Sequence, residues 1–309
     1  MENLKVLITG GTGFVGKNTV KKLTNDNFQV RYTTRGTILE NGKPVKIGDI
    51  SDQDYWREAI AGSNVVVHCL ARVHILKESS TSPYDEFKKT NVDATVALAK
   101  ASLLTSVKKF IFLSTVGVYG NSGTDISENV EPQPNGDYAQ TKLEAEKLLK
   151  EIFKDSDVEL VILRPPLIYG FEAPGNYRSL ENVISKRIPL PLGSISNKRS
   201  FLFVQNLSWV ISELIKSNKE ISGTYNVTDG EVVTTSYFLK SIAHHFSFAM
   251  ILPFPIFLLK LLGKVTGKSR AISKLTDDLS FSSDKLYEIL DKKPLNSMKS
   301  ALVETYKNN

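Results

Sequence analysis

Tyr138 and Lys142 are spaced so that they could carry out acid–base chemistry together. They open a segment with apolar residues at helical spacing, and residues four apart share one face of a helix, so the phenol and the ammonium group can lie side by side. A phenol has an ordinary pKa of about 10, and an adjacent cation stabilises the phenolate. We therefore expect Lys142 to lower the pKa of Tyr138 and to make it a usable proton donor or acceptor. The alternative is an ordinary exposed pair on a helix surface.

Two hydroxyl side chains, Ser114 and Thr115, follow an apolar run at residues 109–113 that has the pattern of a buried strand. A hydroxyl at the carboxyl end of a strand can donate a hydrogen bond to a substrate carbonyl oxygen. Either hydroxyl alone could simply satisfy the end of the strand. Because two hydroxyl side chains stand together where a strand is expected to end, and ligands of parallel sheets bind beyond such strand ends, we predict that they belong to a functional site.

A glycine-rich turn joins the first apolar run, residues 4–8, to a helix-compatible segment at 17–24. Gly10, Gly13 and Gly16 suit a diphosphate, because the missing side chains let the backbone approach the ligand. The start of the following helix points N–H groups and a partial positive charge at the same place. Glycines also mark ordinary turns, but their position at a strand-to-helix junction favours a dinucleotide site.

The residues after the second expected strand, 29–33, indicate which dinucleotide binds. NAD-binding folds usually carry an acidic residue there, which accepts a hydrogen bond from the ribose 2′-hydroxyl. This chain has Arg35 instead, and a guanidinium suits a 2′-phosphate. We therefore predict NADP, with NAD as the alternative if Arg35 is only a solvated turn residue. Asp49, after a possible short strand, is a candidate for contact with the adenine edge.

The elements that must position these groups alternate along the first half of the chain. The expected strands are almost wholly apolar, and the segments between them have helical patterns. This alternation predicts an α/β fold with a doubly wound parallel sheet, and a ligand beyond the carboxyl ends of the strands at the switch point. The expected strands are residues 5–8, 29–33, 65–70, 109–113 and 160–163, and the expected helices are residues 17–24, 52–61, 85–104 and 138–153.

The pattern changes after Arg164, where proline and glycine break regular structure repeatedly. We expect a smaller C-terminal lobe woven into the main domain, with residues 223–228 returning to the sheet as a strand. Residues 1–170 would form the dinucleotide-binding domain, with a returning segment near 202–229. Residues 171–201 and 230–309 would form the substrate-binding lobe.

Composition limits the possible functions. The chain has 309 residues and a net charge of +6 without a dense basic run, so we expect no nucleic-acid binding and a slight preference for a small anionic substrate. The single cysteine, Cys69, excludes an internal disulfide and fits a reducing compartment. No signal-peptide pattern is present, so we expect a cytoplasmic protein without a transmembrane span. Prolines and Lys260 interrupt the apolar stretch 246–262, where we expect folded core rather than contact with a membrane surface.

Four motifs in order resemble those of the extended short-chain dehydrogenase/reductases, and more closely the nucleotide-sugar epimerase/dehydratase branch. They are residues 9–16, residues 114–120, the Tyr138-x-x-x-Lys142 pair and residues 163–170. The resemblance covers essentially the whole chain. It implies a Rossmann domain, a smaller C-terminal lobe that binds a UDP-sugar, hydride exchange with a bound nicotinamide, and a homodimer formed through the helices at 85–104 and 138–153.

The resemblance also implies roles for individual residues. Thr115 would hold the reacting carbonyl, Tyr138 would be the acid–base residue and Lys142 would bind the nicotinamide ribose. Together with the residues singled out above, the predicted cofactor-binding set is Gly10, Thr12, Gly13, Phe14, Val15, Gly16, Arg35, Asp49, Ile50, His68, Leu70, Ala71, Ser114, Tyr138, Lys142 and Pro165. The predicted substrate-binding set is Arg72, Asn91, Thr115, Val116, Tyr138, Asn176 and Arg199, and we expect no metal.

Departures from the family pattern narrow the predicted activity. Dehydratases of this branch carry Asp-Glu after the threonine, whereas this chain has Val116-Gly117, so we do not expect dehydration. Residues 70–74 and 189–193 are similar to bacterial reductases of 4-keto-6-deoxy-N-acetylhexosamines carried on UDP, which serve cell-surface polysaccharide synthesis. Together with Arg35 this favours an NADP-dependent reductase. The alternatives are a UDP-hexose 4-epimerase with tightly bound NAD, a reductase of a small apolar ketone, and a non-enzymatic NADP-sensing module.

Overall fold

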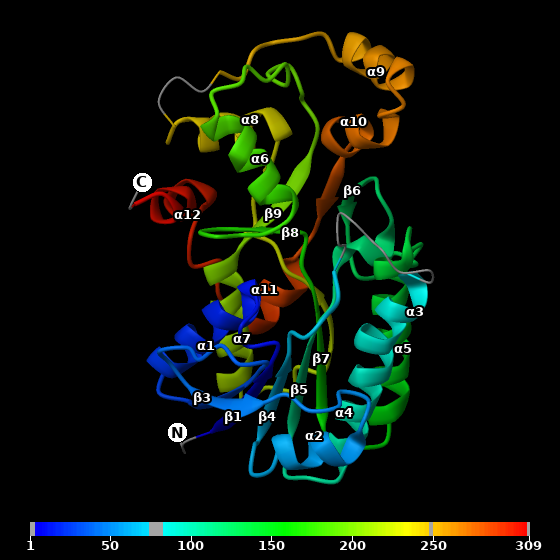
Figure 1. Ribbon diagram of the computed structural model, residues 1–309, viewed down its shortest axis with the longest axis vertical. Coiled ribbons are helices and arrows are strands. Elements are labelled where there is room, and N and C mark those ends of the chain that lie inside the picture. Colours follow the sequence, from blue (N-terminus) through cyan, green and yellow to red (C-terminus); the bar gives the residue numbers. More distant parts are fainter. Residues whose placement is uncertain (1–3, 74–82, 247–249, 308–309) are drawn as a thin grey trace.

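The computed structural model describes residues 4–73, 83–246 and 250–307. Seven parallel strands form its main sheet, in the order β10-β7-β5-β4-β1-β2-β3 (Figure 1). The strand order reverses between β1 and β4, so the carboxyl ends of these two strands flank the switch point. The strands are β1 (Lys5–Thr9), β2 (Gln29–Thr34), β3 (Lys43–Lys46), β4 (Val65–His68), β5 (Lys109–Leu113), β7 (Glu159–Arg164) and β10 (Gly223–Asn226).

Helices cover both faces of this sheet. On the interior strand β1, Val6 and Ile8 pack into the layer of α1 and α7, whereas Leu7 packs into the layer of α2, α4 and α5. All three side chains are fully buried, and burial of each stabilises the fold by about 1.5–3 kcal/mol. The predicted doubly wound parallel sheet is confirmed, as is the strand that returns at β10. The helices are α1 (Phe14–Asn25), α2 (Gln53–Ala59), α4 (Ala94–Leu103), α5 (Asp137–Phe153) and α7 (Val204–Lys216).

The helix predicted over residues 85–104 is present, but it is not a regular α-helix throughout. α3 (Pro83–Lys88) and α4 are separated by a π-helical turn, Lys89–Asp93. Such a turn inserts an extra residue into the helical repeat, and π-helical turns are frequent at functional sites. Asn91, within the turn, is fully buried and hydrogen-bonds to residues outside this helical segment.

A second, smaller sheet lies in the upper half of Figure 1, in the order β11-β9-β12-β6 with β8 paired to β9. Aromatic residues fill its core, and the rings of Phe201 and Phe238 stack with centroids 3.9 Å apart. β6 comes from the first half of the chain, and α11 (Asp284–Leu290) buries Leu286 in the core of the main sheet. The other elements here are β6 (Gly123–Ile126), β8 (Leu167–Tyr169), β9 (Arg199–Phe203), β11 (Val232–Val233), β12 (Leu279–Phe281), α6 (Asn176–Ser185), α8 (Thr235–Ala243), α9 (Ile256–Val265), α10 (Ser269–Thr276) and α12 (Met298–Thr305).

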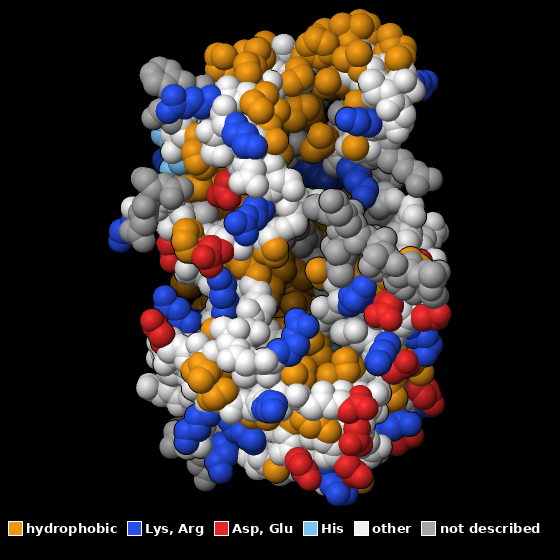
Figure 2. Space-filling model, viewed as in Figure 1, with side chains coloured by type: hydrophobic (Ala, Val, Ile, Leu, Met, Phe, Trp, Pro, Cys, Tyr) orange, Lys and Arg blue, Asp and Glu red, His pale blue; other side chains and the backbone are white. Residues whose placement is uncertain are grey.

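Helix α9 stands at one end of the molecule with an uncovered apolar face (Figures 1 and 2). Gly263 packs against α10, while Phe257, Leu261 and Val265 are 70%, 55% and 78% exposed. The expectation of folded core across 246–262 is therefore wrong for this face of the helix; residues 247–249 of that stretch lie outside the described residues. In the part of the chain that the structure describes, no helix is both long and apolar enough to cross a membrane.

Candidate active site

The glycine-rich turn connects β1 to α1 beside the switch point. Gly10 has a φ of +66°, and a side-chain carbon on it would lie 2.9 Å from the backbone of Leu70. A side-chain carbon on Gly16 would lie 2.2 Å from the Gly10 carbonyl oxygen. The Gly13 N–H donates to that same carbonyl at 3.0 Å and closes the turn directly before the helix. Both Gly10 and Gly16 are therefore required by the close approach of backbone to backbone.

Helix α1 begins at Phe14, immediately after this turn; the predicted residue Thr12 lies in the turn, and Val15 is the second residue of the helix. The backbone N–H groups of a first helical turn have no acceptor within the helix. No acidic side chain occupies that turn. Unpaired N–H groups and the positive end of the helix dipole together suit an anion, so the segment fits a diphosphate.

His68, the last residue of β4, connects the glycine turn to the helix behind the site. Its buried ring lies with Nδ1 2.6 Å from the Thr9 hydroxyl and Nε2 2.8 Å from the Thr95 hydroxyl. Thr95 donates its own proton to the Asn91 carbonyl at 2.8 Å, so the ring must donate from Nε2 and accept from Thr9 at Nδ1. Burial lowers the pKa of His68 to about 3, and the ring is neutral at physiological pH.

Asn91 anchors the segment that follows β4. Its side-chain oxygen accepts the Arg72 N–H at 2.8 Å, and its amide nitrogen lies 3.1 Å from both the Arg72 carbonyl and the Thr141 hydroxyl. Thr141 lies near the start of α5, so one amide links two edges of the predicted site. Leu70 and Ala71 are half-buried on the same segment, beside the glycine turn.

Tyr138 and Lys142 lie one turn apart at the start of α5. The Lys142 Nζ is buried 3.9 Å from the centroid of the Phe112 ring and has no hydrogen-bond partner among the described residues. Burial lowers the pKa of Lys142 to about 7 and raises the pKa of Tyr138 to about 12. The expectation of a lowered Tyr138 pKa is therefore wrong in this structure, because burial of the phenol disfavours its charged form.

Thr115 lies just after β5, where it caps a short 3₁₀ turn, Val116–Tyr119. Its hydroxyl oxygen accepts the Gly117 N–H at 3.0 Å, which leaves the hydroxyl hydrogen for donation to another oxygen. The backbone here is fixed by a hydrogen bond of 3.1 Å from the Val116 N–H to the carbonyl of the predicted residue Pro165. The Val116 side chain itself is buried in an apolar cluster.

A buried ion pair that the sequence analysis missed lies behind Ser114. Glu146 accepts hydrogen bonds from the Ser114 hydroxyl at 2.5 Å and from two nitrogens of Arg164. Arg164 also donates to the Tyr119 hydroxyl at 2.7 Å. The Ser114 hydroxyl is thus donated to Glu146 and does not stand beside Thr115 as a second donor to a substrate. A signal was present: Glu146 follows Lys142 by one helical turn, and Arg164 ends an apolar strand.

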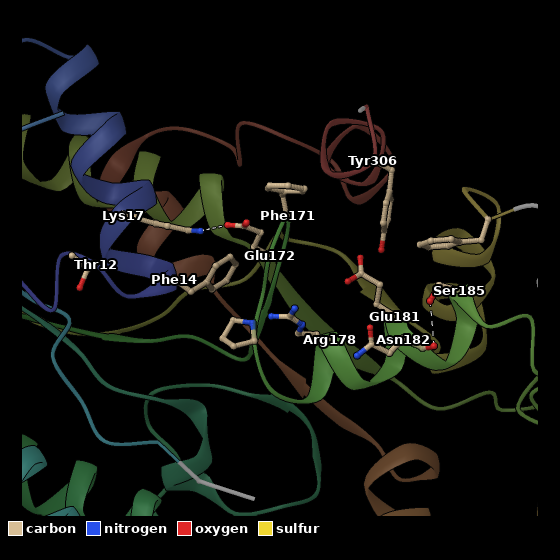
Figure 3. Close-up of a pocket in the computed structure, with 12 residues that line it drawn as sticks. Thr12, Phe14, Lys17, Phe171, Glu172, Arg178, Glu181, Asn182, Ser185 and Tyr306 are labelled. Carbon is tan, nitrogen blue, oxygen red and sulfur yellow. Dashed lines mark hydrogen bonds and ion pairs between the residues drawn. The ribbon is translucent and has the colours of Figure 1, made fainter. Parts of the chain in front are cut away.

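A cavity of about 600 Å³ opens beside the glycine turn, between the start of α1 and α6 (Figure 3). Of the predicted residues, Thr12 and Phe14 line it. Lys17 and Glu172 form an ion pair across one side, and Arg178 of α6 projects into the space. The sequence analysis did not identify these three charged residues, because they come from segments far apart in the chain. The lining is completed by Phe171, Pro174, Glu181, Asn182, Ser185, Phe246 and Tyr306.

The residues predicted to select the dinucleotide lie at the ends of neighbouring strands. Arg35 directly follows β2 and is exposed, as contact with a phosphate on a bound ribose would require. Asp49 accepts hydrogen bonds from the Ser51 hydroxyl at 2.6 Å and the Ser51 N–H at 2.9 Å, which lower its pKa. The Ile50 carbonyl accepts the indole N–H of Trp56 at 2.8 Å. Their contacts with a cofactor stay predictions.

Two predicted substrate residues lie in the second lobe. Arg199 opens β9, where it is partly buried, and its Nη1 lies 3.4 Å from the Asp277 carbonyl. Burial lowers the pKa of Arg199. Asn176 is exposed as the first residue of α6. Among the residues that the structure describes, no group of three His, Cys, Asp or Glu side chains is placed to hold a metal ion.

Comparison with known proteins shows to which family this chain belongs. The family described as "NAD dependent epimerase/dehydratase family" matches residues 6–228. The chain is 35% identical over 307 residues to a UDP-glucose 4-epimerase of Vibrio cholerae, covering 97% of this chain and 94% of that protein. It is 28% identical over 283 residues to an N-acetyl-alpha-D-glucosaminyl-diphospho-ditrans,octacis-undecaprenol 4-epimerase of Escherichia coli O157:H7, covering 88% and 84%.

Solved structures share the fold. A UDP-N-acetylglucosamine 4-epimerase from Bacillus cereus superposes with a TM-score of 0.78 at 21% identity, over 98% of this chain and 96% of that one. A human epimerase family protein, solved with NADPH, gives a TM-score of 0.79 at 16% identity over 99% and 100%. These identities show the fold alone. The family match and the 35% identity go further: the resemblance seen in the sequence is confirmed, and the chain is an enzyme that belongs to the NAD dependent epimerase/dehydratase family.

Proposed function

We propose that this chain uses NADP to reduce the 4-keto group of a UDP-linked 4-keto-6-deoxy-N-acetylhexosamine, a step in making precursors of cell-surface polysaccharides. The observation that carries this direction of reaction is Arg35, which is exposed directly after β2 where an NAD-binding fold would have an acidic residue. A net reductase consumes NADPH from the cellular pool, whereas an epimerase retains and recycles NAD. A cytoplasmic location fits this proposal, because the single cysteine, Cys69, suits a reducing compartment.

Two features support a bound dinucleotide. The turn leaves no room for a side chain at Gly10 or Gly16, so backbone N–H groups can reach a diphosphate. The buried Lys142 Nζ, unpaired among the described residues, would bind the hydroxyl groups of the nicotinamide ribose. When bound, the nicotinamide supplies the hydride that the carbonyl carbon accepts.

The side chains of this protein would handle the proton and the developing charge. With a pKa of about 12, Tyr138 is protonated at neutral pH and would donate its proton to the carbonyl oxygen as that oxygen becomes negative. Thr115, whose oxygen already accepts the Gly117 N–H, would donate a hydrogen bond to the same oxygen. Lys142 would stabilise the tyrosinate that remains. We do not propose dehydration, because Val116 and Gly117 stand where the dehydratases carry their Asp and Glu.

The test is to supply the purified protein with NADPH or NADH and a panel of UDP-4-keto sugars, and to follow loss of absorbance and formation of product. Tyr138→Phe should lower turnover by about 10²–10⁴-fold. Arg35→Ala should weaken NADPH binding by about tenfold or more and leave NADH binding unchanged. Arg31→Ala is the matched control, because this guanidinium donates to the Ala61 carbonyl. Full turnover by Tyr138→Phe, or equal use of both cofactors, would contradict the proposal.

A UDP-hexose 4-epimerase with tightly bound NAD is the second candidate. The 35% identity with the UDP-glucose 4-epimerase of Vibrio cholerae favours it, and Thr115, Tyr138 and Lys142 would serve the same roles. This candidate predicts that the purified protein releases NAD on denaturation and interconverts UDP-GlcNAc and UDP-GalNAc without added cofactor. If the purified protein contains no bound NAD and does not interconvert these sugars, the epimerase is excluded and the reductase is favoured.

A variant of Arg199 distinguishes the third candidate, a reductase of a small apolar ketone, from the two candidates that act on UDP-sugars. If Arg199 contacts the diphosphate of a UDP-sugar, Arg199→Ala should weaken substrate binding by about tenfold or more and leave NADPH binding unchanged. Unaltered affinity for the true substrate would favour an apolar ketone instead. The non-enzymatic alternative is not retained, because the chain belongs to an enzyme family.

We also propose that the enzyme forms a homodimer through α4 and α5, as the family resemblance implies. Exposed apolar side chains on or next to these helices support it: Leu104, directly after α4, is 62% exposed, and Leu148, on α5, is 37% exposed. Sedimentation velocity should show a dimer for the wild-type chain and a monomer for Leu148→Glu. A wild-type monomer at micromolar concentration would contradict the dimer without affecting the proposed chemistry.

A further inference from the structure

The outer face of α9 is an apolar stripe that the described chain leaves uncovered. Phe257, Leu261 and Val265 are 70%, 55% and 78% exposed, and the adjacent Leu262 is 51% exposed. Their spacing of four residues places the first three in one line along the helix. The opposite side packs on α10, where a side-chain carbon on Gly263 would lie 2.7 Å from an isoleucine side chain. The helix is thus held by one side and presents large apolar side chains on the other.

Two short segments that pair with each other next to α9 enlarge this apolar surface. Residues 188–194 and 250–254 run side by side, with the Leu190 N–H donating to the Met250 carbonyl at 2.9 Å and the Gly193 N–H to the Leu252 carbonyl at 2.8 Å. Ile188, Met250 and Leu252 are 49%, 48% and 42% exposed, and the second segment leads directly into α9. Figure 2 shows hydrophobic side chains gathered over this end of the molecule. An apolar patch of this kind marks a binding face.

Basic residues border the stripe, and acidic residues are absent from it. Residues 256–276, which contain α9 and α10, include five basic and no acidic residues. Lys260 and Lys264 are exposed and lie one helical turn apart along one edge of the stripe, and Lys268 follows the helix. Asp277 reaches the Lys260 ammonium only at 3.5 Å, and both side chains are solvent-exposed. The edge therefore presents positive charge to whatever covers the apolar face.

We propose that α9 docks this enzyme onto the surface of an anionic phospholipid membrane. The line of Phe257, Leu261 and Val265 would enter the boundary between headgroups and acyl chains, with Lys260 and Lys264 at the level of the phosphates. Apolar burial and attraction to anionic lipid strengthen such binding together. A second copy of the chain would bring lysine against lysine, which is unfavourable. This inference goes beyond the proposed function, which concerns the crevice at the carboxyl ends of the main strands.

Cosedimentation of the full chain with vesicles tests the proposal. Wild-type protein should bind vesicles of phosphatidylcholine containing phosphatidylglycerol, less so in high salt, and bind pure phosphatidylcholine more weakly. Replacing Phe257, Leu261 and Val265 together by Ser should reduce binding by about 1,000-fold, because each loses about tenfold. Lys260→Gln and Lys264→Gln should each lower binding to the anionic vesicles by about fivefold. The matched control is L295S, which replaces an apolar side chain that is 59% exposed in a loop outside the stripe.

The variants should fold, because the replaced side chains are exposed; thermal unfolding should match the wild-type chain. The proposal is overturned if wild-type protein does not bind anionic vesicles, or if the triple Ser variant binds as well as wild type. It is also overturned if the stripe instead holds two chains together in sedimentation velocity and the triple variant separates them. None of these outcomes needs a sugar substrate, so failure of the reductase assay leaves the docking result intact.

Discussion

His68 should make the stability of this enzyme depend strongly on pH in the acid range. Its buried ring accepts from Thr9 and donates to Thr95, and burial lowers its pKa to about 3 in the folded chain. In the unfolded chain the pKa returns to about 6.5. Between these values the unfolded chain binds a proton that the folded chain does not. The free energy of unfolding therefore falls as the pH falls through this window, and His68 has no such effect above it.

The magnitude follows from the width of the window. One differential proton changes the free energy of unfolding by about 1.4 kcal/mol per pH unit. Going from about pH 7.5 to about pH 5 crosses about 1.5 units of the window, so His68 alone should remove about 2 kcal/mol of stability. Urea unfolding followed by tryptophan fluorescence across this range measures the loss. His68→Gln is the comparison, because the amide can donate and accept but does not titrate; it should start less stable yet lose about 2 kcal/mol less on acidification.

Equal losses in the wild-type chain and in His68→Gln would refute this reasoning. If the variant does not fold, an NMR titration of the wild-type imidazole decides the question instead. Ring signals that stay at their neutral position down to about pH 5 support a buried neutral ring, and a midpoint near about 6.5 refutes it.

Two further predictions test the glycine turn and the buried ion pair, both by chemical denaturation. Gly16→Ala should destabilise the fold by about 1–3 kcal/mol and weaken dinucleotide binding, because the added carbon would lie 2.2 Å from backbone. Gly62→Ala, with a positive φ but nothing within 4 Å, is its control and should leave binding unchanged. Glu146→Gln should cost about 3–5 kcal/mol by leaving the Arg164 cation without a counter-charge, against at most about 1 kcal/mol for Glu144→Gln at the surface. Equal effects within either pair would contradict the argument.

The main sheet could be predicted because its signals are local. In β1 the apolar run at residues 6–8 is followed by Thr9 and the glycine turn, and in β5 the apolar run at residues 110–113 lies between lysines and Ser114. Buried parallel strands bury both faces, so their sequence carries little besides apolar residues. The π-helical turn at Lys89–Asp93 leaves no such signal, because one extra residue shifts the helical repeat without changing the kind of residue that follows.

The positions of the site residues could be predicted from the sequence, but the directions of their pKa shifts could not. Spacing alone puts Tyr138 and Lys142 on one face of α5, and the structure agrees. The direction of each pKa shift depends on what covers the pair, including Phe112 from a strand thirty residues away in sequence. The exposure of α9 was unpredictable for a related reason. Its apolar residues suit a core as well as a docking face, and only the packing of α10 shows which side is buried.

Burial and the charges along α5 together decide how strongly Lys142 is charged near neutrality. Glu146, one helical turn from Lys142, forms its ion pair with Arg164, so this carboxylate is already matched by another cation. Burial then lowers the Lys142 pKa to about 7, although Glu146 opposes the shift, and a lysine only partly charged near neutrality attracts a phenolate weakly. A hydrogen-bond acceptor for the Nζ, which has none among the residues that the structure describes, would raise the Lys142 pKa and strengthen that attraction. The ammonium would then be fully charged beside Tyr138 at the stage when a tyrosinate has to be stabilised, and the pair predicted from sequence would become a working acid–base pair once the site is filled.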